Sequence, residues 1–181
     1  MSNFKPVKKT TFLEAVAACI EHEKKVFEFY VRNADSLPDG PIKTLFYDLA
    51  EDQDEHIKMI ADLYSNVNGG QALPNLKMAS QVQKFNSTSL QILMRRLDRF
   101  TELETARDEI DALALATKQH EDASEFYGKI GEKFDSPDIR YLFKQLSNFQ
   151  DESRLLLESF STYKTQGTPH SQPSAYWDLE T

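Results

Sequence analysis

Residues 23–56 read EKKVFEFYVRNADSLPDGPIKTLFYDLAEDQDEH, and the same pattern returns at residues 120–153 as HEDASEFYGKIGEKFDSPDIRYLFKQLSNFQDES. The paired tyrosines give the offset, 127 − 30 = 97, and this offset aligns further apolar and polar positions without a gap. The matching pairs include Glu28 with Glu125, Phe29 with Phe126, Ile42 with Ile139, Leu49 with Leu146 and Gln53 with Gln150. A repeat of this regularity indicates one supersecondary unit that occurs twice.

Each copy of the repeat has the periodicity of a helical hairpin. Apolar residues recur three, four or seven positions apart, which predicts long helices near 11–35, 41–66, 107–134 and 137–163. Pro41 and Pro137 suit first helical positions. Residues 71–88 are polar and predict a crossing loop, and a short amphipathic helix is expected near 89–104. Two hairpins joined by one long crossover predict an all-α four-helix bundle of the ferritin-like class.

The composition is that of an acidic globular chain, with 40% hydrophobic residues and a net charge of −8. This charge argues against a nucleic-acid partner, because an acidic surface repels phosphate. The single cysteine, Cys19, excludes an internal disulfide and predicts a cytoplasmic protein. No apolar run approaches the ~20 residues that a membrane span needs, and no signal peptide is expected. We expect residues 1–163 to form the bundle and residues 164–181 an extended tail.

Polar residues interrupt the apolar stripes at six positions: Glu23, Gln53, His56, His120, Gln150 and Ser153. Buried polar groups are costly unless they are bonded, so we expect the six to meet at one level of the bundle. A register shifted by one residue would instead turn Glu55, Glu121 and Glu152 inward, and we expect these three to be solvated. Tyr30 and Tyr127 are expected to pack near the centre, Cys19 to be buried and His22 to be exposed.

The phrases EKKVFEFY, LFYDLAEDQDEH, HEDASEFY and LFKQLSNFQDES resemble the rubrerythrin-like branch of the ferritin-like superfamily. The resemblance covers roughly Leu13 to Phe160. It implies a two-iron site with one glutamate from each of the first and third helices and Glu-x-x-His from each of the second and fourth. Only Glu23 and His56 conform to that pattern. The other four positions hold Gln53, His120, Gln150 and Ser153.

These replacements leave three alternatives for the centre of the bundle. Two irons repel each other and need anionic bridges, which a neutral amide does not supply, so a two-iron site is not expected. Glu23, His56 and His120 form a plausible donor set for a single iron or zinc ion. Otherwise Gln53 and Gln150 hydrogen-bond to each other and to the histidines in a network without metal.

Two functional hypotheses follow, and a third is weaker. The chain is a rubrerythrin-like protein that binds one metal ion, with any activity being that of a non-haem-iron oxidoreductase. Alternatively, it is a non-catalytic bundle that binds a protein partner. Iron storage is the weaker hypothesis because it requires an oxidation site. The resemblance also implies self-association as a homodimer.

Overall fold

A computed structural model describes residues 11–67, 69–70, 95 and 106–166. The described residues form four helices and no strand. They are α1 (Phe12–Ser36), α2 (Pro41–Val67), α5 (Glu109–Gly131) and α6 (Pro137–Gln166). The prediction of an all-α, ferritin-like four-helix bundle is confirmed. The short helix expected near 89–104 lies outside the described residues apart from residue 95, as does the tail from residue 167 onward.

The two hairpins begin in the same way. The side chain of Thr11 accepts a hydrogen bond from the backbone N–H of Glu14 at 3.1 Å, and that of Asp108 accepts from Asp111 at 2.8 Å. Both caps satisfy backbone donors that the first helical turn leaves unpaired. Thr11 and Asp108 are separated by the repeat offset, 108 − 11 = 97, so the sequence repeat extends to the helix starts.

Two helix ends differ from the prediction by three residues each. Helix α5 ends at Gly131 and not at residue 134, because Phe134 turns back to stack on Phe143 with ring centroids 5.8 Å apart. A Cβ at Gly131 would lie 3.0 Å from the Cβ of Phe143, so glycine allows this close approach. Helix α6 continues to Gln166 and not 163, and Lys164 in its last turn bonds Glu109 at 3.2 Å.

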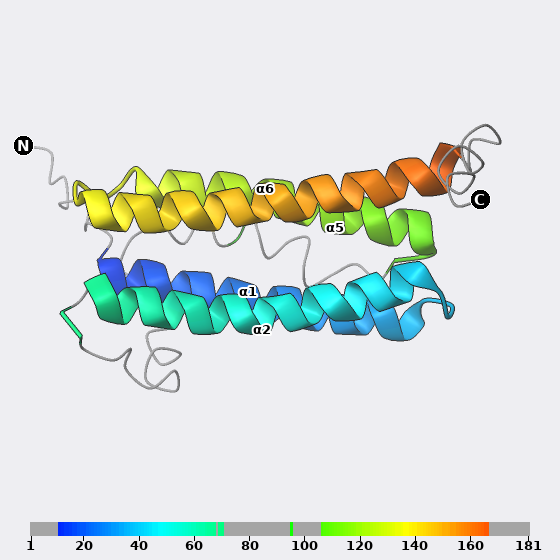
Figure 1. Ribbon diagram of the computed structural model, residues 1–181, viewed down its shortest axis with the longest axis horizontal. Helices are drawn as coiled ribbons and strands as arrows, with labels where there is room; N and C mark the ends of the chain where they lie inside the picture. Colours follow the sequence, from blue (N-terminus) through cyan, green and yellow to red (C-terminus); the bar gives the residue numbers. More distant parts are fainter. Residues whose placement is uncertain (1–10, 68, 71–94, 96–105, 167–181) are drawn as a thin grey trace, which may run out of the picture.

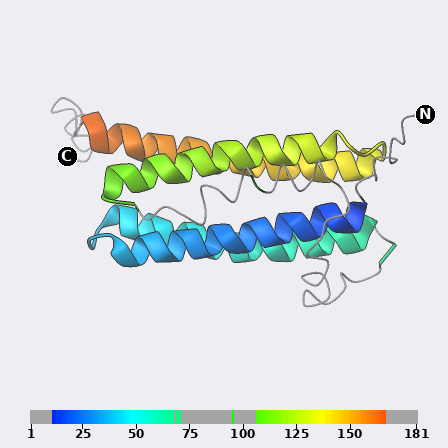
Figure 2. The same cartoon turned by 180° about the vertical axis from the view of Figure 1, so that it is seen from behind.

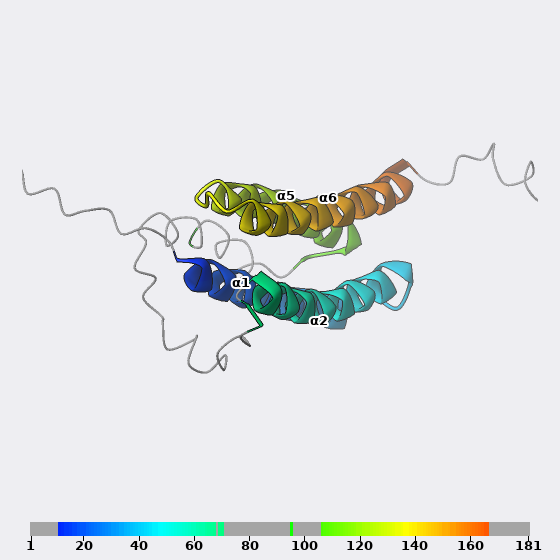
Figure 3. The same ribbon diagram turned by 60° about the vertical axis from the view of Figure 1, so that its left-hand side comes forward.

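The helices form two layers, with α1 and α2 in one and α5 and α6 in the other (Figures 1 and 3). Figure 2 shows α1 and α5 from the opposite side, running in opposite directions. The end of α2 and the start of α5 lie at opposite ends of the bundle (Figure 1). This separation of the two ends is the one expected of ferritin-like folds, in which the second and third long helices are parallel.

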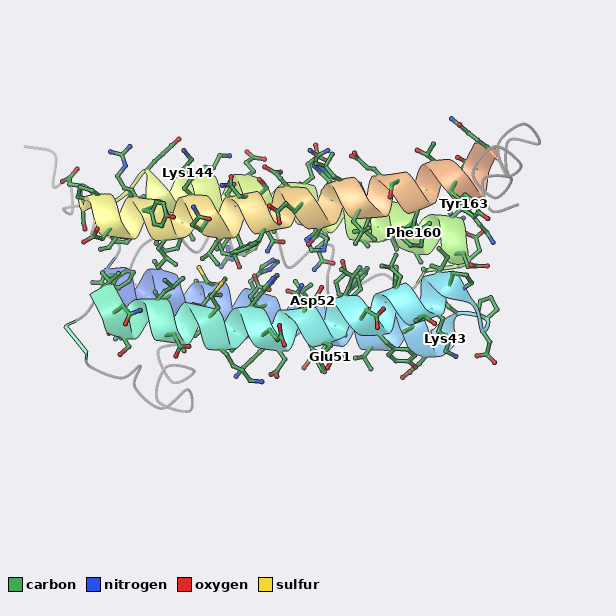
Figure 4. The ribbon with its side chains drawn as sticks, in the orientation of Figure 1. Lys43, Glu51, Asp52, Lys144, Phe160 and Tyr163 are labelled. Carbon is green, nitrogen blue, oxygen red and sulfur yellow. The ribbon has the colours of Figure 1, made fainter. Side chains whose placement is uncertain are left out.

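The apolar core of the described residues has two clusters. One contains Cys19, Ile60 and Tyr127, and the other contains Tyr30, Phe46 and Leu113. Charged side chains such as Glu51 on α2 and Lys144 on α6 point away from the facing layer, whereas Phe160 points toward it (Figure 4). No helix in the described part of the chain has the length and hydrophobicity of a membrane span.

Candidate functional site

A layer of polar side chains lies in the bundle interior. Glu23, Gln53, His120 and Gln150 are all buried, with at most 2% of their surface exposed. His56 and Ser153 are partly exposed. Glu23 on α1 and His120 on α5 are equivalent by the repeat, since 120 − 23 = 97. The polar residues therefore come from all four helices, as the interrupted apolar stripes predicted.

Glu23 is the anion of this layer. Its Oε1 accepts one hydrogen bond from the Tyr127 hydroxyl and another from Nε2 of Gln150 at 3.3 Å. Burial opposes ionisation, but His56, His22 and Tyr127 together outweigh it, so the pKa of Glu23 lies below its ordinary value. The side chain is therefore a carboxylate at neutral pH, and it can only accept hydrogen bonds.

The carboxylate of Glu23 fixes the direction of the neighbouring hydrogen bonds. Because Glu23 only accepts, the Gln150 atom that faces it is the amide NH₂, and the other amide atom is the carbonyl Oε1. That Oε1 lies 2.7 Å from Nδ1 of His120, so Nδ1 carries the proton and donates it. A neutral imidazole protonated at Nδ1 accepts at Nε2, where the hydroxyl of Tyr30 donates.

His120 is neutral in this arrangement. Burial is the largest influence and lowers the pKa of His120 to about 4. One ring nitrogen is bonded to Gln150 and the other to Tyr30. A metal ion could take the Nε2 lone pair only if the Tyr30 hydroxyl moved away. Ligation by His120 stays a prediction, and the observed hydrogen bonds compete with it.

The second carboxylate oxygen of Glu23, Oε2, lacks the hydrogen bonds that Oε1 makes. Oε2 is buried, has no hydrogen-bond partner and lies 3.9 Å from Nδ1 of His56. That distance allows an ion pair but is too long for a hydrogen bond. Burial lowers the pKa of His56. The nearby carboxylate of Glu23 raises it by more than burial lowers it, so the pKa lies above its ordinary value. One helical turn before His56, both amide atoms of Gln53 are buried without a hydrogen-bond partner.

Glu23 and His56 therefore bring two donor groups from α1 and α2 together, and Gln53 adds a buried amide one turn before His56. His56 also reaches the surface, with 20% of its side chain exposed, and its ring stacks on Phe149 at 5.6 Å between centroids. It is thus the member of this set with access to solvent. Among the described residues, no three His, Cys, Asp or Glu side chains converge closely enough to hold a metal ion.

Other predictions for this region have mixed outcomes. Glu55, Glu121 and Glu152 are exposed and Cys19 is buried, as predicted. The prediction that His22 is exposed is wrong. Its ring is fully buried beside Phe126 and Tyr127, because the face of α1 that carries it packs against α5.

Sequence reasoning placed Tyr30 and Tyr127 near the centre but missed their polar roles. Both are fully buried, and each hydroxyl donates to the opposite hairpin. A signal for this was present in the sequence. The tyrosines recur at the repeat offset, seven residues after Glu23 and His120, which is two helical turns.

A family model for rubrerythrin matches residues 12–154, which is well over half of the chain. This chain belongs to the rubrerythrin family. The match extends from the first residue of α1 into α6 and so includes both hairpins. No curated protein and no solved structure gives a significant match.

The donor set of this rubrerythrin-family chain differs from the set that two irons require. Where that site has carboxylates, Gln53 and Gln150 offer neutral amides and His120 an imidazole. Ser153 replaces a histidine. The amide of Gln150 is committed to hydrogen bonds with His120 and Glu23. Glu23 is the one carboxylate among these residues, so they do not fit a carboxylate-bridged pair of ions.

Proposed function

We propose that this rubrerythrin-family chain holds a single divalent metal ion, iron or zinc, between α1 and α2. Glu23 supplies the anionic ligand through Oε2, and His56 supplies Nδ1. The proposal rests on one observation above all, that Glu23 Oε2 is buried without a hydrogen-bond partner and faces His56 at 3.9 Å. A buried carboxylate oxygen without a hydrogen bond is costly, and a cation at this place would offset that cost.

The third protein ligand comes from one of two residues. Gln53 carries a buried amide oxygen without a partner and lies on the same face of α2 as His56. His120, the ligand predicted from the sequence, would first have to release Tyr30. Since no bond has to be broken at Gln53, its amide oxygen is the favoured ligand. Carboxylate, imidazole and amide oxygen are all ordinary ligands of zinc and iron(II).

The metal would compete with a proton at this site. In the metal-free protein the raised pKa of His56, caused by Glu23, favours an imidazolium beside the carboxylate. A metal ion requires the neutral imidazole, so binding releases this proton and weakens as the pH falls. The same competition would make metal binding depend on pH around and below the raised pKa of His56.

We also propose that the two-iron oxidoreductase chemistry of the family is absent here. Among the six polar positions of the described core, Glu23 alone is anionic and can offset the charge of two close cations, and amides at Gln53 and Gln150 do not replace bridging carboxylates. Peroxidase activity is therefore expected to be weak or undetectable.

The test is metal content and zinc titration of untagged protein, followed by calorimetry. We expect one ion per chain, with binding lost in Glu23→Gln, which keeps the shape and removes the charge. Glu21→Gln is the matched control, because Glu21 is an exposed residue of the same helix that pairs with Lys25 at 3.6 Å. Two ions per chain would refute the proposal, and no ion would favour the alternative below.

The alternative is a metal-free bundle that acts by binding another protein chain. It is supported by apolar side chains on the outer part of α6, where Leu155 is 57% exposed, Leu156 43% and Tyr163 62%. A patch of this kind is typical of an interaction surface. Self-association as a homodimer is the simplest form of this proposal. Light scattering of the chain and of a Leu155→Ser, Leu156→Ser variant tests it, and a monomeric parent would exclude the dimer.

A further inference from the structure

Tyr30 has an environment that differs from those of the other described tyrosines. It is fully buried among aromatic rings, with Phe29 and Phe46 at centroid distances of 5.4 and 5.2 Å. Its hydroxyl has one partner, Nε2 of His120. The acceptor is a neutral imidazole whose other nitrogen is held by Gln150 at 2.7 Å. A phenol in an apolar pocket therefore faces a base that is orientated to receive its proton.

We propose that Tyr30 is a site of reversible one-electron oxidation, with His120 as the fixed acceptor of the phenol proton. The co-reactant is an outer-sphere one-electron oxidant, such as a high-potential metal complex, that does not need to enter the bundle. This function does not require a metal ion at Glu23 and His56, and it assigns a redox role to Tyr30 and to His120 in the state in which Nε2 of His120 bonds the Tyr30 hydroxyl.

The step balances as follows. The oxidant takes one electron from the phenol ring, and the oxidation state of its metal falls by one. The O–H bond of Tyr30 breaks and its proton forms a new N–H bond at Nε2 of His120. The products are a neutral tyrosyl radical and an imidazolium that donates to the radical oxygen. Reduction by one electron returns the proton to Tyr30, so no atom leaves the site.

Three features favour this step at Tyr30. Oxidation of a phenol without loss of its proton would leave the positive charge on an apolar ring, whereas transfer of the proton places the charge on His120, whose Nδ1–H donates to Gln150. The hydrogen bond from Nδ1–H to Gln150 leaves Nε2 as the nitrogen without a proton, and this nitrogen faces the Tyr30 hydroxyl. The fully buried ring also cannot meet a second phenoxyl radical, so coupling between chains is prevented.

Tyr127 is the repeat equivalent of Tyr30 but is less suited to the role. Its hydroxyl donates to Glu23, whose pKa is lowered by its histidine and tyrosine neighbours despite burial. Proton transfer from Tyr127 would neutralise the carboxylate that faces His56 and break the ion pair. The proton of Tyr30, in contrast, moves to a neutral partner. The repeat thus provides an internal comparison between two buried tyrosines.

The experiment uses the metal-free chain, photogenerated tris(bipyridine)ruthenium(III) as the oxidant and rapid freezing for electron paramagnetic resonance. We expect a tyrosyl signal that narrows when the tyrosines carry ring deuterium, which separates it from tryptophan radicals. The long-lived part of this signal should be lost in Tyr30→Phe. It should be retained in the matched control Tyr141→Phe, because Tyr141 is 64% exposed.

A second measurement does not depend on a substitution. Labelling the histidines with ¹⁵N should reveal an electron–nuclear double resonance coupling between the radical and one imidazole, as the N–H donor of His120 requires. Absence of this coupling would overturn the proposal even if the Tyr30→Phe chain failed to fold. A long-lived signal that survives in Tyr30→Phe, or that disappears in Tyr127→Phe instead, would also overturn it.

Discussion

Tyr127 on α5 donates a hydrogen bond to Glu23 on α1, across the boundary between the two hairpins. The repeat equivalent, Tyr30 on α1, makes the reciprocal bond to His120 on α5. Each hairpin therefore offers a tyrosine hydroxyl to the polar residue of the other. One acceptor is a carboxylate and the other is a neutral imidazole, so the repeat has kept the geometry while the charge has changed.

The first prediction concerns the bond between Tyr127 and Glu23. Tyr127→Phe removes a buried donor from a buried carboxylate, and the unfolding free energy should fall by about 1–3 kcal/mol. Urea denaturation of the metal-free protein measures this. Tyr141→Phe is the control and should change stability by less than about 0.5 kcal/mol, because Tyr141 is an exposed residue. Equal effects of the two substitutions would mean that the Tyr127 hydroxyl contributes no net stability.

The second prediction concerns the acid dependence of stability that arises from His120. Its pKa is about 4 in the folded chain, with burial as the main cause, and roughly 6.5 when unfolded. Between these values the unfolded chain binds a proton that the folded chain does not. The contribution of His120 to the unfolding free energy should therefore be fully present above roughly pH 6.5. It should be lost as the pH falls toward 4, which lowers the unfolding free energy by about 3 kcal/mol.

The pH effect of His120 has to be separated from that of His56, which has the opposite sign. The pKa of His56 is raised by Glu23 against the effect of burial, so its contribution is present below roughly pH 6.5 and lost at higher pH. Urea unfolding of the parent and of His120→Gln is measured between pH 4.5 and 8. The difference between their unfolding free energies at each pH gives the contribution of His120. A difference that is constant with pH would show that His120 is not the buried neutral group described above.

Much of the fold could be predicted from the sequence because its signals are local or repeated. The apolar spacing of each helix and the offset between Tyr30 and Tyr127 predicted two equivalent hairpins, and the caps at Thr11 and Asp108 follow the same offset. The sequence also predicted that Glu23 and Gln150 point inward, because each continues an apolar stripe, and both are buried. These are properties of one helix at a time.

The pairing of polar atoms could not be predicted in the same way. Whether His120 is available as a ligand depends on Tyr30 and Gln150, which come from two other helices. The burial of His22 likewise depends on the position of α5 relative to α1. Helical periodicity gives the direction of a side chain but not the atom that it meets across the bundle.

The third prediction distinguishes Gln53 as a ligand from Gln53 as an unsatisfied core residue. Gln53→Leu removes a buried amide without hydrogen-bond partners, so the metal-free chain should gain about 1–2 kcal/mol. Zinc affinity should fall if the amide oxygen is a ligand. Gln119→Leu is the matched control, because Gln119 is also buried with both amide atoms unpartnered. It should stabilise the chain and leave zinc affinity unchanged, whereas a zinc affinity unaffected by Gln53→Leu would exclude Gln53 as a ligand.

The fourth prediction restores the donor set of a two-iron site. The variant combines Gln53→Glu, His120→Glu, Gln150→Glu and Ser153→His. Without metal it should be much less stable than the parent, because three added carboxylates would lie close to Glu23 in a buried layer. Iron should recover this stability, since a ligand that binds the folded state stabilises it.

The expected result is two irons per chain in the variant against at most one in the parent, with visible absorbance in the variant alone. Iron analysis, absorbance and thermal unfolding with and without iron(II) measure these quantities on the same samples. Gln119→Glu serves as the control, because it adds a buried carboxylate on α5, one residue before position 120 in the chain, without completing the donor set. Its stability should fall and iron should not restore it. A parent that already binds two irons would show that the amides of Gln53 and Gln150 do not prevent the cluster, and the donor argument made from Glu23 alone would be wrong.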